Sequence, residues 1–87
     1  MKQYNGLVAV VTGAASGIGK AIAIKLAEKG CHLALADKDM DGLETLQQQI
    51  EAKGVECFIA SLDVSDNLAF IEFAQHTHNK FKRIDML

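Results

Sequence analysis

A glycine-rich segment near the N-terminus contains the residues with the clearest chemical potential. Residues 12–19 read Thr-Gly-Ala-Ala-Ser-Gly-Ile-Gly and directly follow an apolar run. Where such a turn opens into a helix, backbone N–H groups and the positive end of the helix dipole point at one place and form an anion site. Gly13 would permit the tight turn, Gly17 the approach of a pyrophosphate, and Gly19 close packing of the helix on the strand. The segment therefore predicts a phosphate-binding loop.

Three other glycine motifs do not fit the spacing. A P-loop needs four residues between its first glycine and a Gly-Lys pair followed by Ser or Thr, whereas five residues separate Gly13 from the pair at 19–20 and alanine follows. The G-x-G-x-x-G fingerprint fails because Ile22 occupies its last position. A G-x-S-x-G elbow is absent because Ser16 directly precedes a glycine. A P-loop phosphotransferase is therefore the least favoured alternative.

The loop lies between a predicted strand and a predicted helix. Residues 7–12 are continuously apolar and rich in β-branched side chains, which is typical of a strand buried on both faces of a parallel sheet. A helix is predicted over residues 18–29, with Ile18, Ile22 and Leu26 on its apolar face. Gly30 stands where a helix C-terminal glycine belongs.

The same alternation then repeats. A second buried strand over residues 33–36 ends in Asp37, and Asp39 can cap a helix that Gly54 closes. The apolar positions of this helix keep the i, i+3, i+7 spacing and are Leu43, Leu46 and Ile50.

A third strand is predicted over residues 55–61. Ser65 is expected to cap a helix over about residues 66–80, and a fourth strand begins at residues 84–87. The third helix directs one group of side chains toward one side, namely Phe70, Phe73, Ala74 and Phe81.

The order β-α-β-α-β-α-β predicts an α/β fold, a partial Rossmann arrangement with a doubly wound parallel sheet. Right-handed crossovers give the expected strand order 3-2-1-4. With 87 residues the chain is at most one domain and is shorter than most.

Composition excludes several classes of function. Hydrophobic residues make up 49% and charged residues 23%, which indicates a globular chain. A net charge of −2 without a basic stripe argues against nucleic acid as a partner. The first apolar run is too short and too interrupted by glycine for a signal peptide or a membrane span, so no membrane partner and a cytoplasmic location are expected.

The cysteines and histidines favour structural roles. Cys31 and Cys57 each lie beside a predicted strand and are interpreted as buried, reduced thiols. His76 and His78 are two residues apart on a helix and face different directions, while His32 lacks an acidic partner at ligand spacing. No metal site is therefore predicted.

Three spaced motifs resemble the short-chain dehydrogenase/reductase family. The loop matches its Thr-Gly-x-x-x-Gly-x-Gly pattern, Asp37 ends the second strand, and Leu-Asp-Val at 62–64 follows the third. The resemblance covers essentially the whole chain. It implies that residues 1–87 form the N-terminal half of a dinucleotide-binding Rossmann domain. It also implies an NAD(P)-dependent oxidoreductase that moves a hydride between nicotinamide and an alcohol or carbonyl substrate.

The resemblance assigns cofactor contacts residue by residue. Asp37 would accept hydrogen bonds from the adenosine ribose hydroxyls, and Asp63 from the adenine amino group beside the backbone of Val64. Other interpretations are a solvated loop acid for Asp37 and a turn or capping aspartate for Asp63. Ser16 and Ile18 would contact the cofactor through a hydroxyl and a backbone N–H. The cofactor-binding residues so implied are Gly13, Ser16, Gly17, Ile18, Gly19, Asp37, Asp63 and Val64.

The choice between NAD and NADP depends on the charges around the ribose. The Asp37 carboxylate can accept from both ribose hydroxyls, with each such bond worth roughly 1.5–3 kcal/mol, and would repel a 2′-phosphate. Ser16 stands where phosphate-preferring relatives often carry Arg or Lys, which also favours NAD. Lys38 favours NADP instead, because a basic residue directly after the Asp37 position can accommodate the 2′-phosphate in some relatives. NAD is expected, with NADP as the alternative.

The family's catalytic residues do not occur in this chain. Its Asn-Asn-Ala-Gly segment, its serine and its Tyr-x-x-x-Lys pair are absent, and Tyr4, the only tyrosine, precedes the first strand. No catalytic residue is therefore assigned. Two interpretations stay open: the cofactor-binding part of an enzyme that is a homo-oligomer at full length, or a truncated, non-catalytic dinucleotide-binding module. An open sheet edge beside the first strand predicts marginal stability or self-association of these 87 residues alone.

Overall fold

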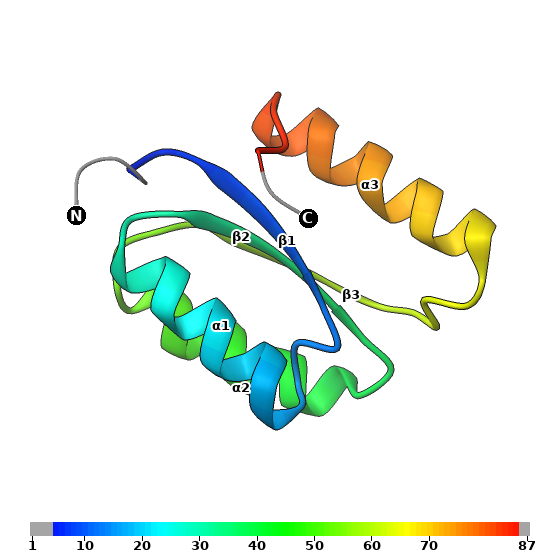
Figure 1. Cartoon of the computed structure of the whole chain (residues 1–87), viewed down its shortest axis with the longest axis horizontal. Helices are drawn as coiled ribbons and strands as arrows, with labels where there is room; N and C mark the ends of the chain where they lie inside the picture. The colour runs from blue at the N-terminus through cyan, green and yellow to red at the C-terminus, as the bar shows by residue number, and fades with distance from the viewer. Residues whose placement is uncertain (1–4, 86–87) are drawn as a thin grey trace.

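The structure is a computed structural model that describes residues 5–85. Strands and helices alternate along the chain (Figure 1). They are β1 (Val8–Thr12), α1 (Gly17–Glu28), β2 (His32–Asp37), α2 (Met40–Glu51), β3 (Cys57–Ser61) and α3 (Asn67–Phe81).

The three strands form one parallel sheet in the order β1-β2-β3. Val10 pairs with Ala34 in β2, and Leu35 of β2 pairs with Ile59 in β3. This confirms the α/β class and the 3-2-1 part of the predicted order. The predicted fourth strand falls partly outside the described residues, since Met86 and Leu87 are not described.

Asp85 nevertheless lies along β1. Its backbone N–H donates to the Val8 carbonyl at 2.8 Å, and its Oδ2 accepts from the Val8 N–H at 2.9 Å. The neighbouring Leu7 carbonyl accepts from His32 of β2, so these Val8 groups point to the opposite edge of β1. The chain therefore returns to the side of β1 where a fourth strand was expected.

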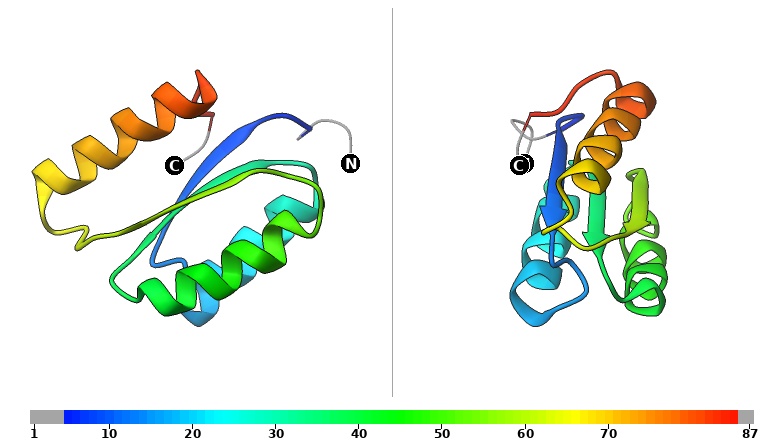
Figure 2. Two further views of the ribbon diagram at one scale, coloured as in Figure 1. Left: turned by 180° about the vertical axis from the view of Figure 1, so that it is seen from behind. Right: turned by 90° about the vertical axis from the view of Figure 1, so that its right-hand side faces the viewer.

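Helices cover both faces of the sheet. α1 and α2 lie on one face and α3 on the other (Figure 2). Val8, Ala9, Val10 and Val11 are all buried, which confirms the prediction of a strand covered on both faces. Leu43, Leu46 and Ile50 of α2 fill the core on the first face, and Phe73 of α3 packs on the second.

The predicted apolar face of α1 was wrong at two of its three residues. The buried residues of this helix are Gly19, Ala23 and Ala27, whereas Ile18 is 80% and Ile22 48% exposed. The helix lies so close to the β1–α1 loop that a Cβ on Gly19 would overlap the Gly13 carbonyl. No side chain fits at that separation, and Ile18, one position earlier, turns outward. Leu26, the third predicted residue, is half-buried and packs against the core.

The predicted start of α3 was also wrong by one residue. Asp66, not Ser65, is the N-cap, and its side chain accepts from the Ala69 N–H at 3.1 Å. Ser65 instead donates its N–H and its hydroxyl to Asp63. With that hydroxyl already committed, the next carboxylate takes the cap position.

Other local predictions were confirmed. Asp39 caps α2 by accepting from the Gly42 N–H at 3.0 Å. Gly30 and Gly54 have positive φ angles of 94° and 91°, as expected after helices. Cys31 and Cys57 are buried thiols.

Within residues 5–85, no helix is long and apolar enough to cross a membrane.

Candidate functional site

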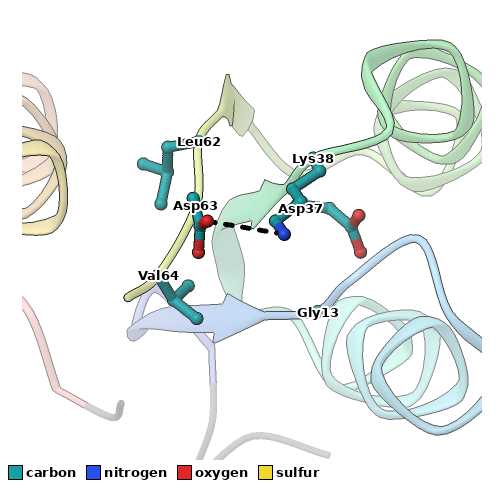
Figure 3. A pocket seen from close by; sticks show the side chains of 6 residues that line it. All are labelled: Gly13, Asp37, Lys38, Leu62, Asp63 and Val64. Atoms are coloured by element: carbon teal, nitrogen blue, oxygen red, sulfur yellow. Dashed lines mark ion pairs between the residues drawn. The ribbon is translucent and has the colours of Figure 1, made fainter. Parts of the chain in front are cut away.

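The carboxyl ends of the three parallel strands meet at one edge of the sheet, where a pocket opens (Figure 3). The pocket has a volume of about 200 Å³. That is less than the roughly 300–1,000 Å³ of a typical small-molecule site, so it can hold only part of a larger ligand. Its lining residues are Gly13, Asp37, Lys38, Leu62, Asp63 and Val64.

The β1–α1 loop lies directly beside this pocket. Gly13 has a φ of 63°, a left-handed conformation that a glycine adopts without strain. The Ala14 N–H donates to the Ala36 carbonyl at 3.2 Å, which attaches the loop to the end of β2. The Ser16 hydroxyl donates to the Gly13 carbonyl at 2.7 Å and so closes the loop on itself.

The N-terminus of α1 is left without a side-chain cap among the described residues. Ser16 occupies the cap position, but its hydroxyl is used within the loop. Asp39 and Asp66, in contrast, cap α2 and α3. The first N–H groups of a helix have no acceptor within it, and the first turn of α1 carries no acidic residue. This helix end therefore presents unsatisfied donors and a positive dipole, which is the chemistry an anion requires.

The glycines of the loop divide into two kinds. Gly13 is explained by its positive φ, and Gly19 by its contact with the Gly13 carbonyl. Gly17 has neither reason, because a Cβ built there would meet no described atom within 4 Å. The absent side chain leaves open space at the uncapped helix end, so the residues present fit a phosphate group approaching the backbone.

Asp37, at the end of β2, is half-buried and hydrogen-bonded to two backbone groups. Its Oδ2 accepts from the Ala15 N–H at 3.0 Å, and its Oδ1 accepts from the Asp39 N–H at 3.0 Å. A carboxylate has about four acceptor positions, so two stay open to hydroxyl donors. The bond to Ala15 also ties the end of β2 to the loop, a role that the sequence pattern did not reveal.

Asp63, after β3, has structural partners of its own. Its Oδ1 accepts from the Ser65 N–H at 2.9 Å and from the Ser65 hydroxyl at 2.7 Å. Its Oδ2 lies 3.4 Å from Lys38 Nζ, and the two side chains point toward one another (Figure 3). The hydrogen bonds from Ser65, then the charge of Lys38, lower the pKa of Asp63. Because both side chains of the ion pair are exposed, the pair holds Lys38 only weakly.

The structure brings only part of the predicted set together around the pocket. Gly13, Asp37, Asp63 and Val64 line it, whereas residues 16–19 lie at the adjoining start of α1. Two lining residues, Leu62 and Lys38, were not predicted as site residues. The sequence placed Lys38 only near a possible 2′-phosphate, and its pairing with Asp63 depends on how β2 and β3 lie side by side.

The histidines lie elsewhere. His76 and His78 are exposed on α3, and His32 accepts from the Glu56 N–H at 3.0 Å and stacks on Phe81. In the described part of the chain, no group of three or more His, Cys, Asp or Glu residues could hold a metal ion.

The alternating parallel architecture, with a glycine loop between its first strand and first helix, is a Rossmann-like fold. The family model described as short chain dehydrogenase matches residues 7–87, and the chain belongs to this family.

Individual relatives agree with that assignment. The putative oxidoreductase SadH of Mycobacterium tuberculosis is 43% identical over 74 residues, which are 85% of this chain and 27% of SadH. The crystal structure of NAD⁺-bound xylitol dehydrogenase matches with a TM-score of 0.93 at 37% identity, over 98% of this chain and 33% of that one. An alcohol dehydrogenase from the archaeon Thermococcus sibiricus, complexed with 5-hydroxy-NADP, matches with a TM-score of 0.86 at 41% identity, over 91% and 34%.

The chain thus spans about a third of the length of these relatives. The solved relatives include complexes with NAD and with an NADP derivative, so NAD(P) is the class of cofactor found in similar structures.

Proposed function

We propose that this chain supplies the NAD(P)-binding part of a short-chain dehydrogenase/reductase. The observation that carries the proposal is the uncapped start of α1, where Gly17 leaves open space beside a pocket at the strand ends. A dinucleotide needs an anion site for its pyrophosphate and an adjacent pocket for its adenosine. The uncapped helix start and the pocket at the carboxyl edge of one parallel sheet support this assignment.

The pyrophosphate is assigned to the backbone N–H groups of residues 17–19, beside Gly13 and Ser16. The adenosine ribose is assigned to Asp37, whose carboxylate retains open acceptor positions. The adenine is assigned to the pocket wall formed by Asp63, Leu62 and Val64. When bound, the nicotinamide end of the cofactor carries the hydride, and the residues of this chain bind and orient the other end.

NAD is the proposed cofactor. A 2′-phosphate on the ribose would approach the Asp37 carboxylate, and the repulsion of like charges opposes it. Lys38 could neutralise that phosphate, but here its ammonium group lies 3.4 Å from Asp63. Binding NADP would therefore require Lys38 to leave Asp63 while Asp37 stays negative.

The chemical step is assigned to residues outside this chain. We propose that residues 1–87 are the N-terminal half of a Rossmann domain and contribute no catalytic group. The whole protein would be a cytoplasmic homo-oligomer that transfers a hydride between nicotinamide and an alcohol or carbonyl substrate. Since the chain spans about a third of its relatives, a dinucleotide-binding module without turnover is the second candidate.

Calorimetric titration of the chain with NAD and with NADP tests the proposal. We expect NAD to bind more tightly, and the amide NMR signals of residues 17–19 and of Asp63 to shift on binding. Asp37→Asn should narrow the preference for NAD over NADP because it removes the repulsive charge. Asp41→Asn is the matched control: it removes the same charge from the exposed first turn of α2 and should preserve the preference.

Absence of binding by either cofactor under conditions where the chain is folded would contradict the proposal. Binding that leaves the signals of residues 17–19 unchanged would contradict the placement of the pyrophosphate. Turnover of an alcohol by the 87-residue chain alone would contradict the assignment of the chemical step to other residues.

A further inference from the structure

Gly42, in the first turn of α2, is a glycine that the local backbone does not require. It lies inside a helix, between Met40 and Glu51, and has no positive φ. Glycine destabilises a helix relative to alanine, because it loses more backbone freedom on folding. An alanine at this position would therefore be favoured if the helix alone decided the residue.

The neighbours of Gly42 supply the missing reason. A Cβ on this residue would lie 3.0 Å from the Cβ of Ala15 and 2.7 Å from Oδ2 of Asp39. Ala15 belongs to the β1–α1 loop, so a distant part of the chain approaches α2 closely at this point. The contact with Asp39 involves a side chain that can turn, whereas Ala15 can give way only if its backbone moves.

Ala15 is also held from a second direction. Its N–H donates to Oδ2 of Asp37 at 3.0 Å, at the end of β2. The loop residue is thus fixed between a strand end and the first turn of the following helix. Ser16 and Gly17 come directly after it, so the position of Ala15 determines where the first N–H groups of α1 point.

We propose that Gly42 is a positioning residue for the anion-binding loop. By lacking a side chain, it lets Ala15 lie against α2 with its N–H on Asp37, which holds the start of α1 in place for a pyrophosphate. This inference rests on the proposed function, because it concerns the same loop. It adds a residue outside the glycine motif, about 25 positions further along the chain, that acts through Ala15 and not by touching the cofactor.

The test compares Gly42→Ala with the double variant in which Ala15→Gly is added. The extra methyl of Gly42→Ala should displace Ala15 and weaken NAD binding by about tenfold, roughly the effect of losing one good hydrogen bond. Removing the opposing methyl in the double variant should restore the affinity to within about threefold of wild type. Gln48→Ala is the matched control, because it places an alanine on an exposed position of α2 far from the loop and should leave the affinity unchanged.

Amide NMR spectra without cofactor give a second measurement. Gly42→Ala should shift the Ala15 and Gly17 signals and speed hydrogen exchange at the Ala15 amide, and the double variant should reverse both effects. If wild type binds NAD and Gly42→Ala binds it equally well, the inference is overturned while the proposed function stands. A loss of affinity that the second substitution does not reverse also overturns it, because Gly42 then acts through the Asp39 cap. If wild type does not bind NAD, the proposed function fails and the spectra still decide whether Gly42 positions the loop.

Discussion

Substituting Gly17 with alanine should separate the stability of this chain from its ability to bind a dinucleotide. Gly17 is the first residue of α1, and a Cβ there meets no described atom within 4 Å. The folded chain therefore accepts the methyl without a clash. Alanine is favoured over glycine in a helix by about 0.5–1 kcal/mol, so the free energy of unfolding should stay the same or rise by up to that amount.

Binding should change in the opposite direction. The methyl would occupy the space through which a pyrophosphate reaches the N–H groups of α1. Hydrogen bonds to a charged group are worth roughly 1.5–3 kcal/mol each, so losing one should raise the dissociation constant for NAD by about tenfold to a hundredfold. Calorimetric titration measures this change, and urea unfolding followed by circular dichroism measures the stability.

Two further variants control for helix propensity and for loop geometry. Ala21→Gly lies on the exposed side of the same helix and should lower stability without changing the affinity. Gly19→Ala should lower both, because its Cβ would overlap the Gly13 carbonyl. If Gly17→Ala binds NAD as tightly as wild type, the pyrophosphate does not approach this residue, and the reasoning from its open surroundings is refuted.

Three other predictions concern stability and reactivity. Burial raises the pKa of Cys57 to about 12, so at pH 8 this thiol should react with a disulfide reagent only as fast as the chain opens, and full reaction of the folded chain within seconds would contradict the burial. Above pH 9 the thiol ionises in the unfolded chain before it does so in the folded chain, so the free energy of unfolding should fall as pH rises. This fall should be less steep in Cys57→Ala. Hydrogen bonds from Arg83 and from the Val8 N–H lower the pKa of Asp85, so the stabilisation by this carboxylate should be complete above the ordinary carboxyl pKa and fade as pH falls below it. In Asp85→Asn, the melting temperature should therefore fall less steeply at acid pH. An unchanged profile would show that the contact with β1 contributes nothing to stability. Lys82 ends α3 with a φ of 66°, so Lys82→Gly should stabilise the chain by a few tenths to about 1 kcal/mol in urea unfolding. A destabilisation would mean that contacts of the lysine side chain contribute more free energy than its left-handed backbone conformation costs.

The sequence predicted those features that depend on local chemistry. Continuous apolar strands, the Asp39 cap and the glycine after each of the first two helices follow from preferences that act within a few residues. The parallel order followed from alternation of strands with helices and from the handedness of crossovers. These rules need no knowledge of which side chains meet.

Apart from the start of α3, where the nearby Asp63 accepts from the Ser65 hydroxyl, the sequence failed where a distant contact decided the outcome. Ile18 and Ile22 keep good helical spacing with Leu26, yet both are exposed, and the fully buried residues of the helix are Gly19, Ala23 and Ala27. At Gly19 the reason is the close approach of the Gly13 carbonyl. The bond from Ala15 to Asp37 and the pairing of Lys38 with Asp63 likewise join residues 22 and 25 positions apart. A hydrophobic pattern records which residues are apolar, and it does not record how closely two elements approach.

The features of this chain that its own packing leaves unexplained gather at the start of α1. Without a side-chain cap, α1 lacks about 1 kcal/mol of stabilisation, and the glycine at its first residue, Gly17, lowers its stability further. Ile18, its second residue, is 80% exposed and therefore adds little hydrophobic burial. Asp39 and Asp66, in contrast, cap the other two helices. Local rules that are broken together at one place support the proposal that a ligand binds there. In the proposed function, the uncapped N–H groups would hold the negatively charged pyrophosphate, the open space at Gly17 would admit it, and the pocket beside Asp37 would take the adjoining adenosine.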